Sequence, residues 1–192
     1  MKNQTKHIAI FASGAGSNAQ KIIDHFRNSK FVKINLIVCN KPGAGVLQIA
    51  SAENIPVLMI EKKIFNDTGY VEELKHHQID FIILAGFLWK LPAILINAFP
   101  ERIINIHPAL LPSYGGKGMY GNAVHATVIN AGEKQSGITI HYVDDKYDHG
   151  KIIFQKTCTV DENETAESLA QKIHKLEHQH YPKQIEILLD KI

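Results

Sequence analysis

Short apolar runs of strand length alternate with segments of helical periodicity along the first half of the chain. The apolar runs cover residues 7–12, 34–39, 57–60, 80–85 and 102–106. Between these runs, apolar residues recur at helical spacing over residues 19–26, 46–52, 71–77 and 92–98. This alternation constrains the fold most strongly, because successive strand–helix–strand units build a parallel sheet with helices on both faces.

The pattern changes in the second half of the chain. Residues 108–121 hold two prolines and four glycines with little periodicity, which predicts a long ordered loop of the kind that often carries function. The expected elements that follow are a helix over 123–131, strands over 136–143 and 151–160, and a long helical segment over 165–191.

We predict one α/β domain over residues 1–192, because the sequence shows no repeat, low-complexity tract or linker. The expected architecture is Rossmann-like. It is an open, mostly parallel twisted sheet with helices on both faces and antiparallel C-terminal strands.

Composition and charge favour a small partner. Apolar residues make up 45% of the 192 residues, enough for the core of one domain. There are 21 Lys and Arg residues against 19 Asp and Glu residues, so the net charge of +2 favours neither nucleic acid nor a membrane surface. The apolar runs have strand length and residues 1–7 are polar, so we expect no membrane span, no secretory signal and a cytoplasmic protein. Cys39 and Cys158 show no metal-ligand spacing and are expected to be reduced thiols.

A glycine turn joins the first expected strand to the first helix. The pattern Gly14-x-Gly16-x-x-Ala19 in this context is typical of dinucleotide-binding sites. Such a site also uses an acidic residue about 20 residues further on to bind the ribose hydroxyl. This chain has Cys39-Asn40-Lys41 at that place, so we do not predict NAD as a cofactor.

The same turn suits a single phosphate group. Glycines let the backbone approach the ligand, and the N–H groups of the first helical turn, with Ser17 and Asn18 as further donors, favour the phosphate of a mononucleotide. The alternative interpretation is a tight turn in which Ser17 or Asn18 caps the helix and no ligand binds.

Asn105 and His107 lie at the end of the strand expected over 102–106. Residues two apart in a strand point to the same side, and open α/β sheets bind ligands at this end of their strands. An amide donor beside an imidazole suits acyl transfer, in which Asn stabilises an oxyanion and His donates to it or moves a proton. The chain has no GxSxG motif, so a substrate amine is expected to attack directly. The alternative is a strand-end histidine held by local hydrogen bonds.

Further polar residues leave alternatives open. Asp144, Asp145 and Asp148 lie in the turn between the last two strands, and spacing does not decide which of them orients an imidazole or accepts a proton. His141, on the preceding strand, is either a member of the site or exposed. Trp89, which precedes Lys90, stacks on an aromatic ligand or covers the sheet edge. The helical residues 174–180 include His174, Glu177, His178 and His180, but they show no recognisable metal-ligand spacing, so we predict no metal.

Several motifs together resemble the folate-dependent formyltransferases along nearly the whole chain. They are Ser13-Gly14-Ala15-Gly16-Ser17-Asn18, Leu84-Ala85-Gly86-Phe87, Asn105-Ile106-His107-Pro108-Ala109-Leu110-Leu111-Pro112, Ser136-Gly137-Ile138-Thr139-Ile140-His141, Asp148-x-Gly150 and Glu177-His178-x-x-Tyr181-Pro182. The first and last of these resemble the small member of the family that acts in purine biosynthesis. That resemblance implies transfer of the formyl group of 10-formyltetrahydrofolate to the amine of glycinamide ribonucleotide.

The resemblance also implies roles for particular residues. The catalytic residues would be Asn105, His107 and Asp148, with Asn105 and His107 at the oxyanion and Asp148 orienting His107 or receiving the amine's proton through water. The ribonucleotide contacts would be Gly16, Ser17 and Asn18 at the phosphate and Glu177 at the ribose. The folate contacts would be Leu88, Trp89, Lys90, Leu91, Asn105, Tyr142, Val143 and Asp144. Residues 1–100 would then form the phosphate-binding half and residues 101–192 the catalytic and folate-binding half.

Other functions are weighed against this one. Methionyl-tRNA formyltransferase needs a further carboxy-terminal domain and a basic tRNA surface, and formyltetrahydrofolate hydrolase needs a regulatory domain before the glycine turn, so neither is expected. A formyltransferase for a nucleotide-sugar amine shares the catalytic residues, but the monophosphate turn argues against it. Outside the family, a nucleotide-binding module without chemistry and an NAD-dependent dehydrogenase remain as alternatives. The sequence leaves a monomer and a homodimer equally open.

Overall fold

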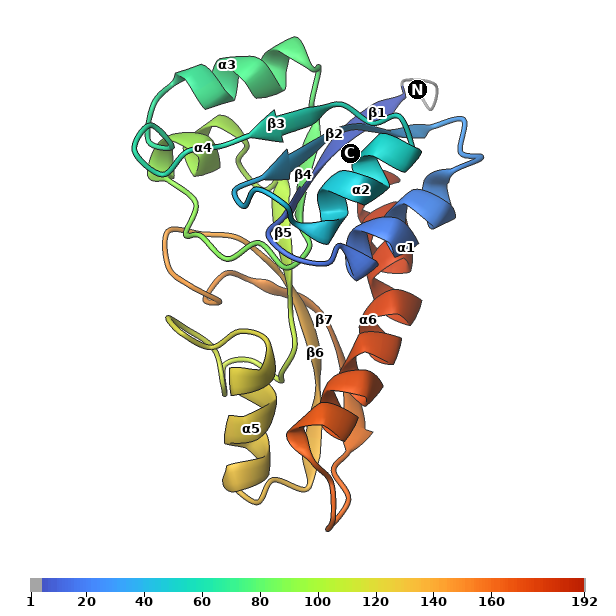
Figure 1. Cartoon of the computed structure of the whole chain (residues 1–192), viewed down its shortest axis with the longest axis vertical. Helices are drawn as coiled ribbons and strands as arrows, with labels where there is room; N and C mark the ends of the chain where they lie inside the picture. Colours follow the sequence, from blue (N-terminus) through green and yellow to red (C-terminus); the bar gives the residue numbers. More distant parts are fainter. Residues whose placement is uncertain (1–4, 192) are drawn as a thin grey trace. The chain divides into compact units, whose positions relative to one another are not determined.

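The computed structural model describes residues 5–191 and is shown in Figure 1. Its elements, in chain order, are β1 (Lys6–Ala12), α1 (Ser17–Phe26), β2 (Val32–Cys39), α2 (Gly45–Ala52), β3 (Val57–Met59), α3 (Gly69–His76), β4 (Phe81–Leu84), α4 (Ala93–Ala98), β5 (Ile103–His107), α5 (Asn122–Asn130), β6 (Gln135–Tyr142), β7 (Ile152–Thr159) and α6 (Ala166–Leu189). The described residues form two compact units, with the boundary between Ile104 and Asn105.

The first unit is built around β1. This strand pairs in parallel with β2 on one edge and with β4 on the other, and β3 pairs in parallel with β2. Ile10 of β1 lies opposite Ile37 of β2 and Ile83 of β4. Residues 8–12 are at most 1% exposed, because a central strand of a parallel sheet is covered on both faces.

Helices of the first unit pack in two pairs (Figure 1). α1 and α2 contact each other and β2, and α3 contacts α4. The buried residues of α1 recur at the spacing of one helical face and are Ala19, Ile22, Ile23 and Phe26. The apolar residues that recur at helical spacing in the sequence are therefore the residues that α1 buries.

The second unit combines an antiparallel strand pair with two helices. β6 pairs with β7, α6 packs against both strands, and α5 packs against α6. α6 begins with a capping box, in which Ser168 N donates to Thr165 Oγ1 at 3.1 Å and Thr165 N donates to Ser168 Oγ at 3.0 Å. The helix continues through the buried Pro182 to Leu189.

The strand order is β3-β2-β1-β4-β5-β6-β7. Together with the parallel pairs of β1–β4 and the antiparallel pair of β6 and β7, this order confirms the predicted α/β class. Each expected element begins and ends within two residues of its predicted bounds. β3 is an edge strand, and its Val57 and Met59 side chains are 41% and 40% exposed.

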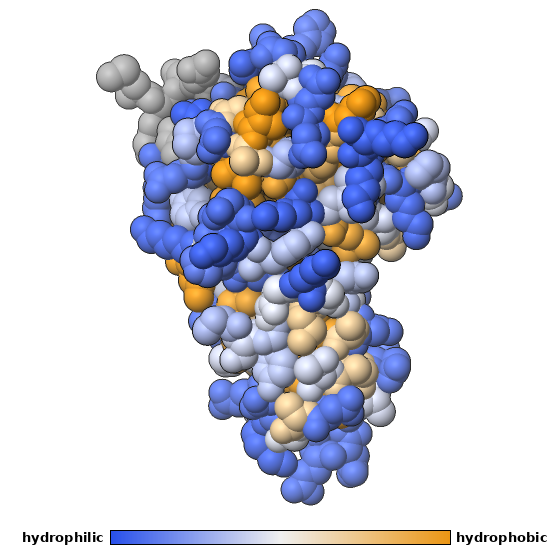
Figure 2. Space-filling view, turned by 90° about the vertical axis from the view of Figure 1, so that its left-hand side faces the viewer, coloured by the Kyte–Doolittle hydropathy of each residue, from blue (hydrophilic) through white to orange (hydrophobic). Residues whose placement is uncertain are grey.

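Hydrophilic residues dominate the face of the molecule drawn in Figure 2, with apolar residues exposed between them. No helix within residues 5–191 is long and apolar enough to cross a membrane. The polar segment 1–7, on which the expectation of no secretory signal rests, includes residues 1–4, which lie outside the described residues.

Candidate active site

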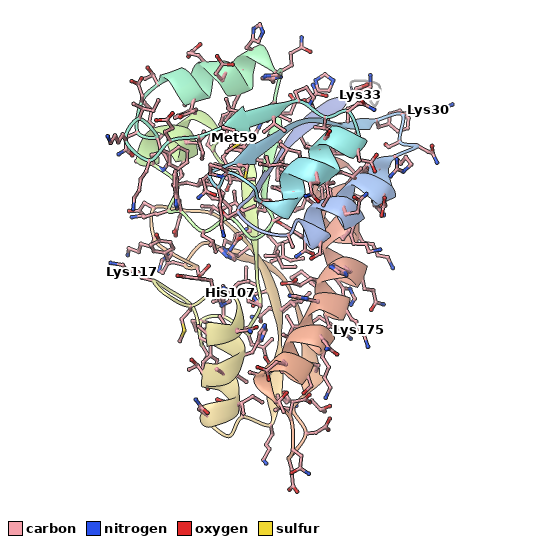
Figure 3. The ribbon with its side chains drawn as sticks, viewed as in Figure 1. Lys30, Lys33, Met59, His107, Lys117 and Lys175 are labelled. Carbon is pink, nitrogen blue, oxygen red and sulfur yellow. The ribbon has the colours of Figure 1, made fainter. Side chains whose placement is uncertain are left out.

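Three polar side chains meet at the end of β5. Asn105 and His107 lie two residues apart on this strand, and Figure 3 labels His107. His107 is only 3% exposed. Asp148 comes from the loop between β6 and β7, where its φ of 51° places it in the left-handed region. Asp148 Oδ1 lies 3.4 Å from Asn105 Nδ2, and Asp148 Oδ2 lies 3.5 Å from His107 Nδ1. The structure therefore brings the three predicted catalytic residues together within the second unit.

The contacts of Asp148 differ from those of Asp144 and Asp145, the two other aspartates of this loop. Gly116 N donates to Asp148 Oδ2 at 2.9 Å, which ties the carboxylate to the loop over 108–121. Asp144 instead accepts from Lys146 N and contacts His149 Nδ1 at 2.8 Å, and Asp145 is exposed. Asp148 is thus the aspartate whose carboxylate contacts Asn105 and faces His107.

The loop that follows His107 is anchored to β6 and β7. Thr139 Oγ1 of β6 donates to Ala109 O at 2.7 Å and accepts from Leu111 N at 3.0 Å. Gln155 Nε2 of β7 donates to Leu111 O at 2.9 Å. These bonds pair the backbone of an irregular segment and hold the start of the loop beside the strands.

A carbonyl of this loop decides which nitrogen of His107 is available. His107 Nε2 lies 2.8 Å from Tyr114 O. A carbonyl can only accept, so Nε2 carries the hydrogen and the neutral ring keeps its lone pair on Nδ1, the nitrogen that faces Asp148. The Tyr114 hydroxyl donates to Glu133 Oε1 at 2.6 Å, which helps to hold the carbonyl in place.

Burial and nearby polar groups shift the pKa values of His107 and Asp148. Burial lowers the pKa of His107, although the nearby Asp148 carboxylate and the Tyr114 carbonyl oppose the effect. Burial alone would raise the pKa of Asp148, but the nearby His107 ring and the Gly116 N–H bring the pKa of Asp148 below its ordinary value. At neutral pH the site therefore holds an ionised carboxylate beside a neutral imidazole.

His141 belongs to the same cluster, a role that the sequence left open. Its side chain is 2% exposed, its Nε2 lies 3.2 Å from Asn105 Nδ2, and its Nδ1 lies 2.8 Å from Tyr142 O. The available signal was its position inside the apolar strand segment of β6, which favours burial over exposure. Strand alternation alone does not tell which of the two faces meets the site.

The predicted phosphate turn has the conformation that a backbone anion site requires. Gly16 has a φ of 83° and precedes α1, and a Cβ there would lie 2.9 Å from the backbone of Val46. Val46 N donates to Gly14 O, so α2 begins against the turn. No side-chain cap closes the start of α1 in the described structure, Ser17 is exposed and Asn18 is half-buried. The N–H groups of a first helical turn lack partners within their own helix and suit an anion.

The predicted folate segment after β4 is partly committed to packing. Trp89 lies against Phe65 and Phe87, at ring-centroid distances of 5.8 Å and 6.4 Å. Leu91 is buried, whereas Leu88 is 45% exposed. Trp89 therefore joins an aromatic cluster of the first unit. Stacking of Trp89 on a ligand stays a prediction.

Other predicted contact residues differ in exposure. Glu177 lies on the buried face of α6 and is 6% exposed. Tyr142, Val143 and Asp144 follow one another at the end of β6 and are half-buried, and Lys90 is exposed. Within residues 5–191, no group of three or more His, Cys, Asp or Glu side chains has a geometry that could hold a metal ion.

Comparison with known proteins identifies the family. A sequence model of the formyl transferase family matches residues 6–185. The chain belongs to the formyl transferase family.

Relatives within the formyl transferase family share much of the sequence. Phosphoribosylglycinamide formyltransferase of Bacillus subtilis (strain 168) is 40% identical over 190 residues, which cover 96% of this chain and 95% of that protein. The chloroplastic phosphoribosylglycinamide formyltransferase of Arabidopsis thaliana is 40% identical over 183 residues, covering 92% of this chain. The chain spans 63% of the length of the Arabidopsis relative and 61% of its counterpart from Vigna unguiculata.

Solved structures of the formyl transferase family share the fold. Phosphoribosylglycinamide formyltransferase from Bacillus halodurans matches with a TM-score of 0.87 and 37% identity, covering 96% of this chain and 95% of that chain. Glycinamide ribonucleotide transformylase 1 from Geobacillus kaustophilus matches with a TM-score of 0.88 and 35% identity, covering 97% of this chain and 100% of that chain.

Proposed function

We propose that the chain transfers the formyl group of 10-formyltetrahydrofolate to the primary amine of glycinamide ribonucleotide, a step of purine biosynthesis. The observation that carries the proposal is the contact cluster of Asn105, His107 and Asp148 in a chain of the formyl transferase family. The names of the relatives from Bacillus subtilis and Arabidopsis thaliana support the choice of acceptor.

The amine attacks the formyl carbon directly. Its nitrogen forms the new C–N bond, and the formyl oxygen becomes the oxyanion of a tetrahedral intermediate. Collapse of the intermediate breaks the bond between the carbon and N10 of the folate, and the proton lost by the amine ends on that nitrogen. An amide hydrogen of Asn105 stabilises the oxyanion. The sequence has no GxSxG motif, so no acyl-enzyme is invoked.

His107 and Asp148 manage the proton of the attacking amine. His107 offers its Nδ1 lone pair, because its Nε2–H is given to Tyr114 O. Proton uptake places an imidazolium 3.5 Å from the ionised Asp148 carboxylate, which stabilises the charge. The positive ring then also favours the negative charge on the formyl oxygen.

Further residues of the chain are assigned to substrate binding. Gly16, Ser17 and Asn18 bind the ribonucleotide phosphate through the start of α1, which has no side-chain cap in the described structure. Glu177 binds the ribose hydroxyls. The folate co-substrate contacts Asn105 and the segments over 88–91 and 142–144, and the reaction uses neither a metal nor NAD.

The proposal extends to partners and location. The expected partners are the two small-molecule substrates, since a net charge of +2 gives no strong attraction to nucleic acid or to a membrane. We place the reaction in the cytoplasm and expect a monomer or a homodimer.

Substitution of His107 by alanine tests whether the cluster performs chemistry or only binds. Loss of a positioned proton carrier lowers turnover by at least about 100-fold, so His107→Ala is expected to lose formyl transfer to that extent. Calorimetry should find both substrates still bound. His76→Ala, which removes an exposed imidazole of α3, serves as the matched control and should keep wild-type turnover. Turnover of His107→Ala within a few-fold of wild type would refute the catalytic assignment.

A further inference from the structure

Each ring nitrogen of His141 faces one polar group: Nδ1 faces the carbonyl oxygen of Tyr142, and Nε2 faces the side-chain amide of Asn105. Nδ1 lies 2.8 Å from Tyr142 O, which can only accept, so Nδ1 carries the hydrogen of the neutral ring. Nε2 then presents a lone pair. The competing tautomer, with its hydrogen on Nε2, would give up the 2.8 Å bond for an Asp148 oxygen at 3.6 Å, which is beyond hydrogen-bonding distance.

The Nε2 lone pair of His141 determines how the Asn105 amide is turned. Asn105 Nδ2 lies 3.2 Å from His141 Nε2 and 3.4 Å from Asp148 Oδ1. Both neighbours accept hydrogen bonds, so they select the amino end of the amide. Turning the amide by 180° would replace two donor–acceptor contacts with a carbonyl oxygen facing a lone pair and a carboxylate.

We infer that His141 is a positioning residue for formyl transfer, which holds the Asn105 amide so that its amino group, and not its carbonyl oxygen, can donate to the reacting formyl oxygen. This inference rests on the proposed function. The contact with Asp148 is the longer of the two, so the second amide hydrogen is the one that moves to the oxyanion. The bond to His141 stays in place during the reaction and keeps the amide from turning.

The glycine of the Asp148-x-Gly150 motif supports the same arrangement. A Cβ at Gly150 would overlap the carbonyl oxygen of Tyr142, the group that sets the tautomer of His141. Gly150 is buried, and Tyr142 N donates to Lys151 O at 2.9 Å. The close approach of the Gly150 backbone therefore holds the Tyr142 carbonyl in place, and this carbonyl in turn sets the tautomer of His141.

Steady-state kinetics of two substitutions test the role of His141. His141→Leu removes the acceptor and should lower kcat by about 10- to 100-fold, less than or similar to the loss of an oxyanion donor, while the KM values change less than about threefold. His141→Gln offers an acceptor oxygen at a similar reach and should restore most of kcat. Ser136→Ala is the matched control on β6, because Ser136 is also 2% exposed and its Oγ has no partner in the described residues.

A double-mutant cycle separates positioning from a general structural effect. If His141 acts through the amide, His141→Leu should change kcat less than about twofold when Asn105 is already alanine. The same fold-loss in both backgrounds, or a loss that appears in KM alone, overturns the inference. Wild-type protein that transfers no formyl group overturns the proposed function instead.

Imidazole ¹⁵N NMR tests the tautomer of His141 without measuring turnover. A His141 ring protonated on Nε2 alone overturns the positioning role.

Discussion

His125 is a buried imidazole whose protonation opposes folding. It lies on α5 with 2% exposure, and its Nδ1 has no hydrogen-bond partner within the described residues. Burial, followed by the nearby His174 and His107 rings, lowers the pKa of His125 from 6.5 to about 4. The native state therefore keeps this ring neutral over a range in which the unfolded chain takes up a proton.

This difference predicts a loss of stability in mild acid. The unfolded state binds the extra proton below pH 6.5, so the free energy of unfolding falls as the pH drops from 6.5 toward 4. The contribution of His125 to that fall is on the order of 3 kcal/mol. His125→Leu should flatten the pH dependence of the urea midpoint in this window. An equally steep dependence in the variant and the wild type would show that another group is responsible.

At the scale of elements, the turn before α1 depends on one of its two glycines. Gly16 has a φ of 83° and no room for a Cβ against Val46 and Ile49, whereas a Cβ at Gly14 meets no atom within 4 Å. The same substitution in one turn should therefore have two different effects.

Alanine at each position provides the test. Gly16→Ala combines left-handed strain with overpacking and should cost about 2–4 kcal/mol of unfolding free energy. Gly14→Ala should stay within about 0.5 kcal/mol of wild type. Denaturant unfolding of both variants measures the difference, and equal losses would contradict the packing account. Because the turn carries the proposed phosphate site, Gly16→Ala should also raise the KM for the ribonucleotide.

The elements were predictable from the sequence to a greater extent than the contacts between side chains. Apolar periodicity located β1 and α1 because burial of one face leaves a repeating pattern. It did not select Asp148 among the three aspartates of its loop, since that choice depends on a left-handed φ of 51° and on the Gly116 N–H. It also left His141 undecided, because alternation along β6 does not say what the strand packs against.

At the scale of the whole molecule, the described fold and the sequence agree with membership of the formyl transferase family and support the proposed formyl transfer. The parallel strands β1–β4 and the antiparallel pair β6 and β7 match the expected architecture. The formyl transferase family model matches residues 6–185, which includes both the glycine turn and the cluster around His107. The central claim is that this cluster passes a formyl group to a ribonucleotide amine.

The most direct test follows the loss of the formyl group from 10-formyltetrahydrofolate, or from its dideaza analogue, by absorbance. Purified protein is assayed with glycinamide ribonucleotide, without an acceptor, and with a nucleotide-sugar amine. We expect turnover only with glycinamide ribonucleotide. Equal loss of the formyl group without an acceptor would make the chain a hydrolase, turnover only with the nucleotide-sugar amine would change the acceptor, and no turnover in any mixture would contradict the claim.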